Sequence, residues 1–209
     1  PMMECKKMLE KTGGDITAAL EEFRKKGVKA SLAERAASEG RVCAIVADDR
    51  KSAAIIELNC NTDFTAKSEP FLKLAARAAA ALLKNPSANV ADDADVKGGA
   101  TEVSQQTGEN VRIGKSATVT APQGGTCGMY LYVATGKIGV IMSFGGTPSD
   151  ELITDIGGHI AFSRPLALNR DGIAPDLVEK ERALAVEQAK ATGKPQQIAE
   201  KIAEGKLNA

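Results

Sequence analysis

The sequence predicts an α+β protein with a duplicated core, in which a β-hairpin followed by a helix occurs twice. Residues 42–58 and residues 129–143 each contain two apolar, partly β-branched runs around a short polar turn, which is typical of antiparallel hairpins. Apolar residues at spacings of three and four then follow, over residues 71–82 and 152–162, and predict helices with one buried face. This repeated order indicates two copies of one subdomain and differs from a βαβ nucleotide fold.

Residues 1–27 predict a small helical module. Two short helices are separated at Thr12-Gly13-Gly14, and Asp15 caps the second helix. The apolar face of that helix contains Ile16, Ala19, Leu20 and Phe23. Helices this short bury too little apolar surface to be stable alone, so the module needs a third element. Residues 28–40, rich in Ala, Ser and charged residues, predict a helical linker.

Residues 41–90 form the first half of the predicted core. A turn at residues 48–51 joins its two strands, and the second strand, residues 53–58, is apolar enough to be buried on most of its surface. Pro70 is tolerated only in the first turn of a helix, so the main helix begins near Ser68.

A polar corner, residues 59–66, lies between that strand and that helix and must be exposed. Thr62 can cap a separate short turn, and Asp63 suits the positive end of the turn. Phe64 is unusual at such a corner, and its position leaves two interpretations open. The ring either folds back onto its own helix or projects as a wedge for the groove of a partner.

A polar connector, residues 91–109, is expected to divide the two halves of the core. It contains the acidic run Asp92-Asp93-Ala94-Asp95 and the pair Gly98-Gly99. These residues favour a loop that contributes little to the core. The second half covers residues 110–209 and ends in a helical hairpin, residues 176–207.

The second half repeats the order of the first. Residues 111–120 alternate like a strand, the second hairpin follows, and Asp150 precedes a helix whose apolar residues are Leu152, Ile153, Ile156, Ile160 and Phe162. Asp176 and Glu179 are spaced as a capping box at the start of the helical hairpin.

Gly114-Lys115-Ser116 resembles the phosphate-gripping end of a P-loop, but the match fails in two ways. Glu109 stands where the first glycine of the motif is required. The tripeptide also lies within a strand pattern, whereas a P-loop joins a strand to a helix N-terminus. A nucleotide-binding enzyme is therefore the weakest interpretation of the chain.

The composition excludes several classes of partner. Lys plus Arg and Asp plus Glu both number 27, so no basic excess favours nucleic acid or an anionic membrane. Aromatic residues make up 3% of the chain, with no Trp, which leaves little for base stacking. No uncharged apolar stretch approaches the roughly 20 residues that a membrane-spanning helix needs.

The cysteine and histidine positions also show no spacing typical of a metal site or a disulfide framework. Cys5, Cys43, Cys60 and Cys127 form no Cys-X-X-Cys pair, and His159 is the one histidine. We therefore expect reduced thiols, no metal site and no cofactor. A lone histidine without a carboxylate or nucleophile beside it is more often a core or interface residue than a base.

Several motifs resemble the elongation factor Ts family, in the same order along nearly the whole chain. The strand at Glu57-Leu58 followed by Thr62-Asp63-Phe64-Thr65-Ala66 is similar to the family's TDFVA signature, with Thr65 in place of the commoner Val. Further matches are Met2–Lys7, Ile138-Gly139-Val140, Gly158–Pro165 and Gln197–Lys206. The resemblance implies that the N-terminal module is ubiquitin-associated-like and lacks a first helix.

The resemblance also implies a guanine-nucleotide exchange factor that binds elongation factor Tu and performs no covalent chemistry. Implied partner-binding residues are Asp63, Phe64, Thr62, Lys6, Met2, Met3, Ile138, Gly139 and His159. From the residues alone, Met2 and Met3 fit core filling as well as docking, and Lys6 fits a solvated charge. The competing function is a module that docks on a GTPase without exchange activity. A bacterial cytoplasm or an organellar matrix is expected, and a higher-order assembly of exchange complexes stays open.

Overall fold

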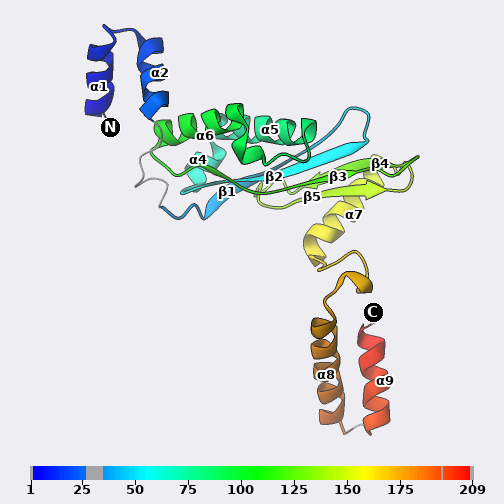
Figure 1. The fold of residues 1–209 in the computed structure, drawn as a ribbon. Helices are drawn as coiled ribbons and strands as arrows, with labels where there is room; N and C mark the ends of the chain where they lie inside the picture. The colour runs from blue at the N-terminus through cyan, green and yellow to red at the C-terminus, as the bar shows by residue number, and fades with distance from the viewer. Residues whose placement is uncertain (1, 27–34, 194, 208–209) are drawn as a thin grey trace. The chain divides into compact units, whose positions relative to one another are not determined.

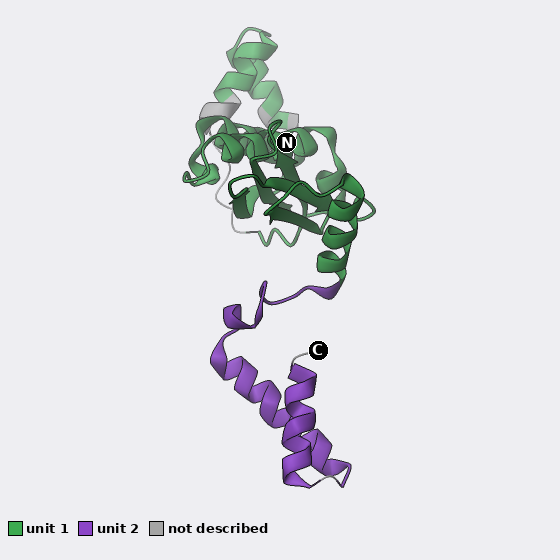
Figure 2. Ribbon diagram, turned by 90° about the vertical axis from the view of Figure 1, so that its right-hand side faces the viewer, with its two compact units in different colours: residues 1–162 green, residues 163–209 purple. Residues whose placement is uncertain are grey.

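The computed structural model describes residues 2–26, 35–193 and 195–207 of the chain. These residues form two compact units, residues 1–162 and residues 163–209 (Figure 2). Helices combine with small antiparallel sheets, which confirms the predicted α+β class (Figure 1). Within the described ranges, no helix is both long and apolar enough to cross a membrane.

The N-terminal part contains a pair of helices, α1 (Met2–Lys11) and α2 (Ile16–Lys26). Asp15 Oδ1 accepts a hydrogen bond from the Ala18 amide at 3.0 Å, which confirms the predicted cap. Met8 and Ala19 are buried. Ile16 and Leu20 are exposed, so the predicted apolar face is wrong for these two residues. Two short helices cannot cover a whole apolar face between them.

The main sheet has the order β1-β2-β3 and is antiparallel throughout. Its strands are β1 (Glu39–Val46), β2 (Ser52–Cys60) and β3 (Arg112–Thr120). The hairpin of β1 and β2 is the predicted one, with Val46 opposite Ala53. The pairing of β3 with β2 joins the two halves of the core in one sheet, which the sequence pattern did not predict.

The core lies between this sheet and the helix α5 (Glu69–Lys84). Alternate residues of β2, namely Ile56, Leu58 and Cys60, point toward the helix and are almost fully buried. The predicted stripe of α5 is buried with them: Phe71, Leu74, Ala75, Ala78 and Leu82. Figure 1 shows α5 and α6 covering one face of the sheet.

The segment predicted as a polar connector is helical and contributes to the core. It holds η1 (Val90–Asp92) and α6 (Ala94–Thr107), with Val90, Val96 and Val103 buried. Asp93 is the N-cap, since its carboxylate accepts from the Asp95 and Val96 amides. The acidic run therefore starts a helix and does not form a loop.

The two adjacent glycines of α6 are expected to respond oppositely to alanine. Gly98 faces open space, so Gly98→Ala should stabilise the chain by up to about 1 kcal/mol. A Cβ on Gly99 would clash with Arg77 and lie 2.8 Å from Leu74 Cδ1, so Gly99→Ala should cost about 1–3 kcal/mol. Urea denaturation of both variants measures the difference. Equal changes at the two positions would contradict the packing of α6 on α5.

The predicted helical linker is wrong over residues 35–40. Residues 35–38 are irregular, and Glu39 and Gly40 already belong to β1, paired with Cys60 and Asn59. A Cβ at Gly40 would collide with the Leu58 carbonyl oxygen, and Gly40 has a φ of 156°, so the close pairing needs glycine here. Residues 28–34 of the expected linker lie outside the described residues.

The second hairpin lies on the other face of the main sheet from α5 (Figure 1). It consists of β4 (Thr126–Leu131) and β5 (Gly139–Phe144), close to the predicted strands. Helix α7 (Asp150–Ser163) packs on the hairpin through Ile153, whose Cγ2 lies 2.6 Å from the position of a Cβ on Gly128. Leu152 and Phe162 are exposed, so the predicted apolar face of this helix is narrower than its sequence indicates.

Residues 163–209 form the second compact unit, in which two helices pack as a hairpin. They are α8 (Pro175–Ala191) and α9 (Gln196–Leu207), preceded by the short η2 (Arg170–Gly172). The buried residues of the hairpin are all alanines: Ala185, Ala189, Ala199 and Ala203. The predicted capping box is wrong, because Ala174 is the N-cap and makes no side-chain hydrogen bond. The predicted domain boundaries as a whole stay a prediction.

Candidate partner-binding site

The polar corner contains a helix of its own, α4 (Asp63–Lys67), between β2 and α5. Thr62 is its N-cap, and the Thr62 hydroxyl accepts a hydrogen bond from the Thr65 amide at 3.4 Å. Ser68 separates α4 from α5 and donates through Oγ to the Thr65 carbonyl at 2.8 Å. The separate turn predicted from Pro70 is confirmed.

Phe64 projects from this turn with 83% of its surface exposed. The next two residues, Thr65 and Ala66, are buried against the core, so α4 has one outer and one inner face. Of the two interpretations of Phe64, the fold-back onto its own helix is wrong. Because a large aromatic ring in water forgoes the free energy of burial, its exposure favours a docking role.

Asp63 lies beside Phe64 on the outer face. Lys67 Nζ donates to Asp63 Oδ2 at 2.6 Å, one helical turn away. This hydrogen bond, together with the positive charge of Lys67, lowers the pKa of Asp63. Both side chains are more than half exposed, so a partner can exchange this ion pair for contacts of its own at little cost.

The carboxylate of Glu109 fixes the polar corner through hydrogen bonds. One carboxylate oxygen accepts from the Asn61 and Thr62 amides, each at 3.0 Å, and the other accepts from the Thr62 hydroxyl at 2.6 Å. Burial alone would raise the pKa of Glu109, but hydrogen bonds from Thr62, Thr65 and Asn61 outweigh it, and the pKa is lowered. Sequence reasoning considered Glu109 only as a failed P-loop glycine and missed this role.

Two asparagines extend the attachment. Asn61 Oδ1 accepts from the Asn110 amide at 2.8 Å, and Asn61 Nδ2 donates to the Ala36 carbonyl at 2.7 Å. Asn110 Nδ2 donates to the Arg35 carbonyl at 2.8 Å. The chain that enters β1 and the chain that leaves α6 are therefore both bound to the base of the corner.

The thiol of Cys60 adds one further contact, a hydrogen bond of 3.1 Å to the Thr62 carbonyl. Burial, together with the negative charge of Glu109, raises the pKa of Cys60 to about 11. The thiol is therefore protonated at neutral pH and remains a donor to the corner. It is fully buried and unreactive by the same argument.

Ile138 and Gly139 directly follow Lys137, which is bound to the end of the sheet that carries the corner. Lys137 Nζ binds Glu39 Oε2 at 2.7 Å, and Glu39 pairs with Cys60 at the end of β2. A Cβ on Gly139 would lie 2.8 Å from Val42 Cγ1, so this glycine lets β5 approach the sheet. A glycine in a strand suits either the close approach of another backbone or a bulge. Here the nearest atoms belong to the side chains of Val42, Leu131 and Ile55, and β5 pairs with β4 in unbroken register, so neither expectation is met.

His159 lies on α7, on the opposite side of the second hairpin from the main sheet. The neighbouring Gly157 is buried against Tyr130, and its absent Cβ would lie 3.0 Å from Met142 Cε. His159 itself is exposed, which excludes the core role that a lone histidine often has. His159 and Phe64 therefore lie on different elements, α7 and α4.

The predicted contacts of the N-terminal helices are surface residues where the structure describes them. Met3 is 64% exposed, and Lys6 is exposed and pairs with Glu10 at 3.8 Å. The side chain of Met2 lies outside the described residues. Partner binding by each of the predicted residues stays a prediction.

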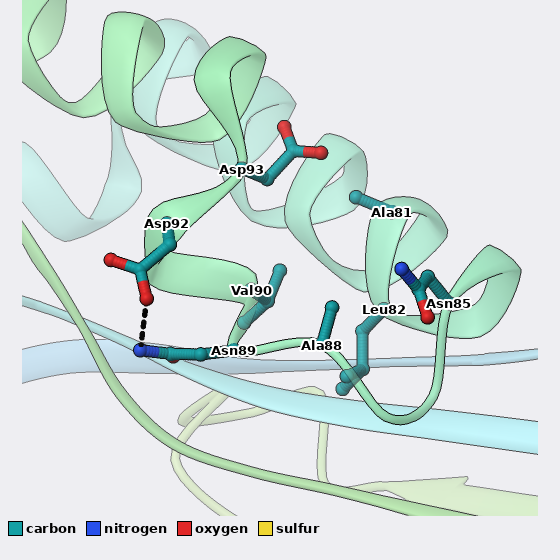
Figure 3. Close-up of a pocket in the computed structure, with 8 residues that line it drawn as sticks. All are labelled: Ala81, Leu82, Asn85, Ala88, Asn89, Val90, Asp92 and Asp93. Atoms are coloured by element: carbon teal, nitrogen blue, oxygen red, sulfur yellow. Dashed lines mark hydrogen bonds between the residues drawn. The ribbon is translucent and has the colours of Figure 1, made fainter.

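A nucleotide site of the P-loop type is contradicted by the fold. Gly114-Lys115-Ser116 lies within β3, where Ser116 pairs with Ile56 of β2. Figure 3 shows a pocket between the end of α5 and η1, lined in part by Asp92 and Asp93. Its carboxylates already accept hydrogen bonds from Asn89 and from the first turn of α6, and their charge disfavours phosphate. The described residues contain no cluster of three or more His, Cys, Asp or Glu that could hold a metal ion.

An α+β scaffold that presents an exposed aromatic ring on a tightly held turn is typical of proteins that dock on another protein. The sequence profile described as "Elongation factor TS" matches residues 61–209. The chain belongs to the elongation factor Ts family.

Curated relatives named "Elongation factor Ts" agree with this assignment. The protein of Methylococcus capsulatus is 39% identical over 99% of this chain and 72% of its own length. That of Thiobacillus denitrificans is 41% identical over 98% and 72%, and that of Chlorobaculum tepidum 35% over 99% and 77%. The resemblance found in the sequence is confirmed. Family membership gives the chain a role in translation elongation, with a translation elongation factor as partner.

Proposed function

We propose that this chain is a guanine-nucleotide exchange factor for elongation factor Tu in the bacterial cytoplasm. It binds the GDP-bound partner, destabilises the site that holds magnesium and the phosphates, and promotes loss of GDP so that GTP can bind. The observation that carries the proposal is the exposure of Phe64 on a turn held by Glu109. Such a side chain can enter a groove of the partner without being ordered first.

The proposed mechanism is a difference in affinity and involves no covalent step. An exchange factor must bind the distorted, nucleotide-poor state of its partner more tightly than the GDP-bound state, because only differential affinity shifts an equilibrium. Linkage is reciprocal, so GDP weakens the binding of the factor by the same ratio by which the factor weakens GDP.

The size of the required shift indicates that Phe64 does not act alone. Burial of one phenylalanine side chain contributes about 1.5–3 kcal/mol. A shift of about ten-thousandfold in a population requires about 5.5 kcal/mol of differential binding. The remainder is assigned to a divided set of contacts: Asp63 beside the wedge, Lys6 and Met3 on α1, Ile138 with Gly139 on the second hairpin, and His159 on α7.

Release of a fluorescent GDP analogue from purified elongation factor Tu tests the proposal by stopped flow. With excess unlabelled GDP, substoichiometric amounts of this chain are expected to accelerate release, since each molecule of a true exchange factor acts repeatedly. The chain has no Trp, so protein fluorescence from it does not interfere.

The competing function makes a different prediction for the same experiment. A docking module without exchange activity would bind elongation factor Tu in a pull-down or by calorimetry and leave the release rate unchanged. That result would overturn the proposed exchange function while leaving family membership intact.

A further inference from the structure

We propose that Glu109 is a positioning residue for exchange: its carboxylate sets the direction in which Phe64 projects. This inference rests on the proposed function, since it concerns the same docking turn. Glu109 lies 45 positions from Phe64 in the sequence and belongs to the segment between α6 and β3, so it reaches the corner only through the fold.

Helix α4 cannot hold its position by itself. It has five residues, and a helix of one turn has almost no stability without tertiary contacts. Ser68 fixes its C-terminal end through a bond to the Thr65 carbonyl. At its N-terminal end the fixed point is Glu109, which accepts from two consecutive backbone amides and from the Thr62 hydroxyl.

The contacts to Glu109 are strong and converge on one side chain. Hydrogen bonds to an ionised carboxylate are about twice as strong as bonds between neutral groups. Three donors from Asn61 and Thr62 converge on one side chain, so the backbone just before Asp63 has little freedom to rotate. Because Phe64 follows two residues later, any rotation there would swing its ring through a wide arc.

The backbone segment that carries Glu109 is itself anchored. The next residue, Asn110, is buried and is bound to Asn61 and to the Arg35 carbonyl, and the Val111 amide donates to Ser104 Oγ at 3.1 Å. The segment that carries the carboxylate is therefore part of the core, whereas the ring of Phe64 is almost entirely in solvent. A rigid base and a free ring are what a preorganised wedge requires.

Three variants separate positioning from charge and from folding. Glu109→Ala removes all three acceptor contacts and is expected to slow GDP release about ten- to a hundredfold, the range set by loss of hydrogen bonds to a charged group. Glu109→Gln keeps an acceptor oxygen for the two amides but loses the charge and the acceptor for the Thr62 hydroxyl, so its rate should lie between those of the alanine variant and the unmodified chain. Glu69→Ala removes an equal charge near the corner, from an exposed side chain that pairs with Lys73, and should leave the rate unchanged.

A double-mutant cycle with Phe64→Ala shows whether Glu109 acts through the ring. If it does, Glu109→Ala should slow release no further in a chain that already lacks the Phe64 ring. Additive losses in the cycle would overturn the proposal, because they would mean that Glu109 contributes independently or by general destabilisation.

A second measurement does not depend on exchange. Phe64→Trp places the only Trp of the chain on the turn, and its fluorescence anisotropy reports the mobility of that side chain. Adding Glu109→Ala should lower the anisotropy, whereas adding Glu69→Ala should not. An unchanged anisotropy overturns the positioning role even if exchange is observed, and a lowered one supports it even if the chain lacks exchange activity.

Discussion

Phe64→Ala is expected to slow exchange about ten- to a hundredfold, because it removes a side chain whose burial in a partner contributes about 1.5–3 kcal/mol. The same change should alter the free energy of unfolding by less than about 0.5 kcal/mol, since the ring is 83% exposed and supports no core contact. The two effects together separate a docking residue from a structural one.

Stopped-flow release of labelled GDP measures the first effect, and urea denaturation followed by circular dichroism measures the second. Phe64→Leu is the matched control, because it keeps an apolar side chain of similar reach and should retain part of the activity. Unfolding of Phe64→Ala, or an unchanged rate of release, would mean that the ring is not a wedge.

Phe71→Ala, seven positions further along the chain, should lower stability strongly and leave the exchange activity of the folded chain intact. Its ring is fully buried between α5 and β2, and the truncation should lower the free energy of unfolding by about 3–5 kcal/mol through lost burial and an uncollapsed cavity. This is a large part of the stability of a typical domain.

The expected readout for Phe71→Ala is a lower denaturation midpoint with exchange activity retained at temperatures where the variant is still folded. Phe71→Leu should lose less, because it leaves a smaller cavity. A loss below about 1 kcal/mol for Phe71→Ala would contradict the burial of this ring.

The parts of the fold that were predictable are those with strong local periodicity. The stripe of α5, the apolar run of β2 and the break at Pro70 each appear within a few residues of sequence, and the structure has each of them. The exposure of Phe64 did not follow from that break, because the same short helix buries Thr65 and Ala66, and only the fold decides which of its side chains face outward.

Helix α6 was not predictable from the same signals because its composition is typical of a loop. Asp93 and the two glycines are common in turns, yet here Asp93 caps a helix and Gly99 permits close packing on Leu74. The apolar residues that remain, Val96 and Val103, are too few to show a helical period.

Glu109 was missed because its role depends on strand register. The pairing of Asn59 with Arg112 brings the residues before β3 alongside the residues after β2, and only then does the carboxylate reach Thr62. One feature of the sequence could have indicated this role. The polar pair Glu109-Asn110 comes shortly before one predicted strand, and the polar pair Asn61-Thr62 comes shortly after another. Antiparallel pairing of those strands would have joined the two polar segments.

The pairing of β3 with β2 also determines how long one edge of β2 stays unpaired during translation. Translation releases β1 and β2 first, and the outer edge of β2 has no neighbour until residues 61–111 have followed and β3 has emerged. At about 5–20 residues per second this interval lasts several seconds. An unpaired edge that carries Ile55, Ile56 and Leu58 is a template for pairing with another chain. A member of the protein-synthesis machinery is thus most exposed to aggregation during its own synthesis.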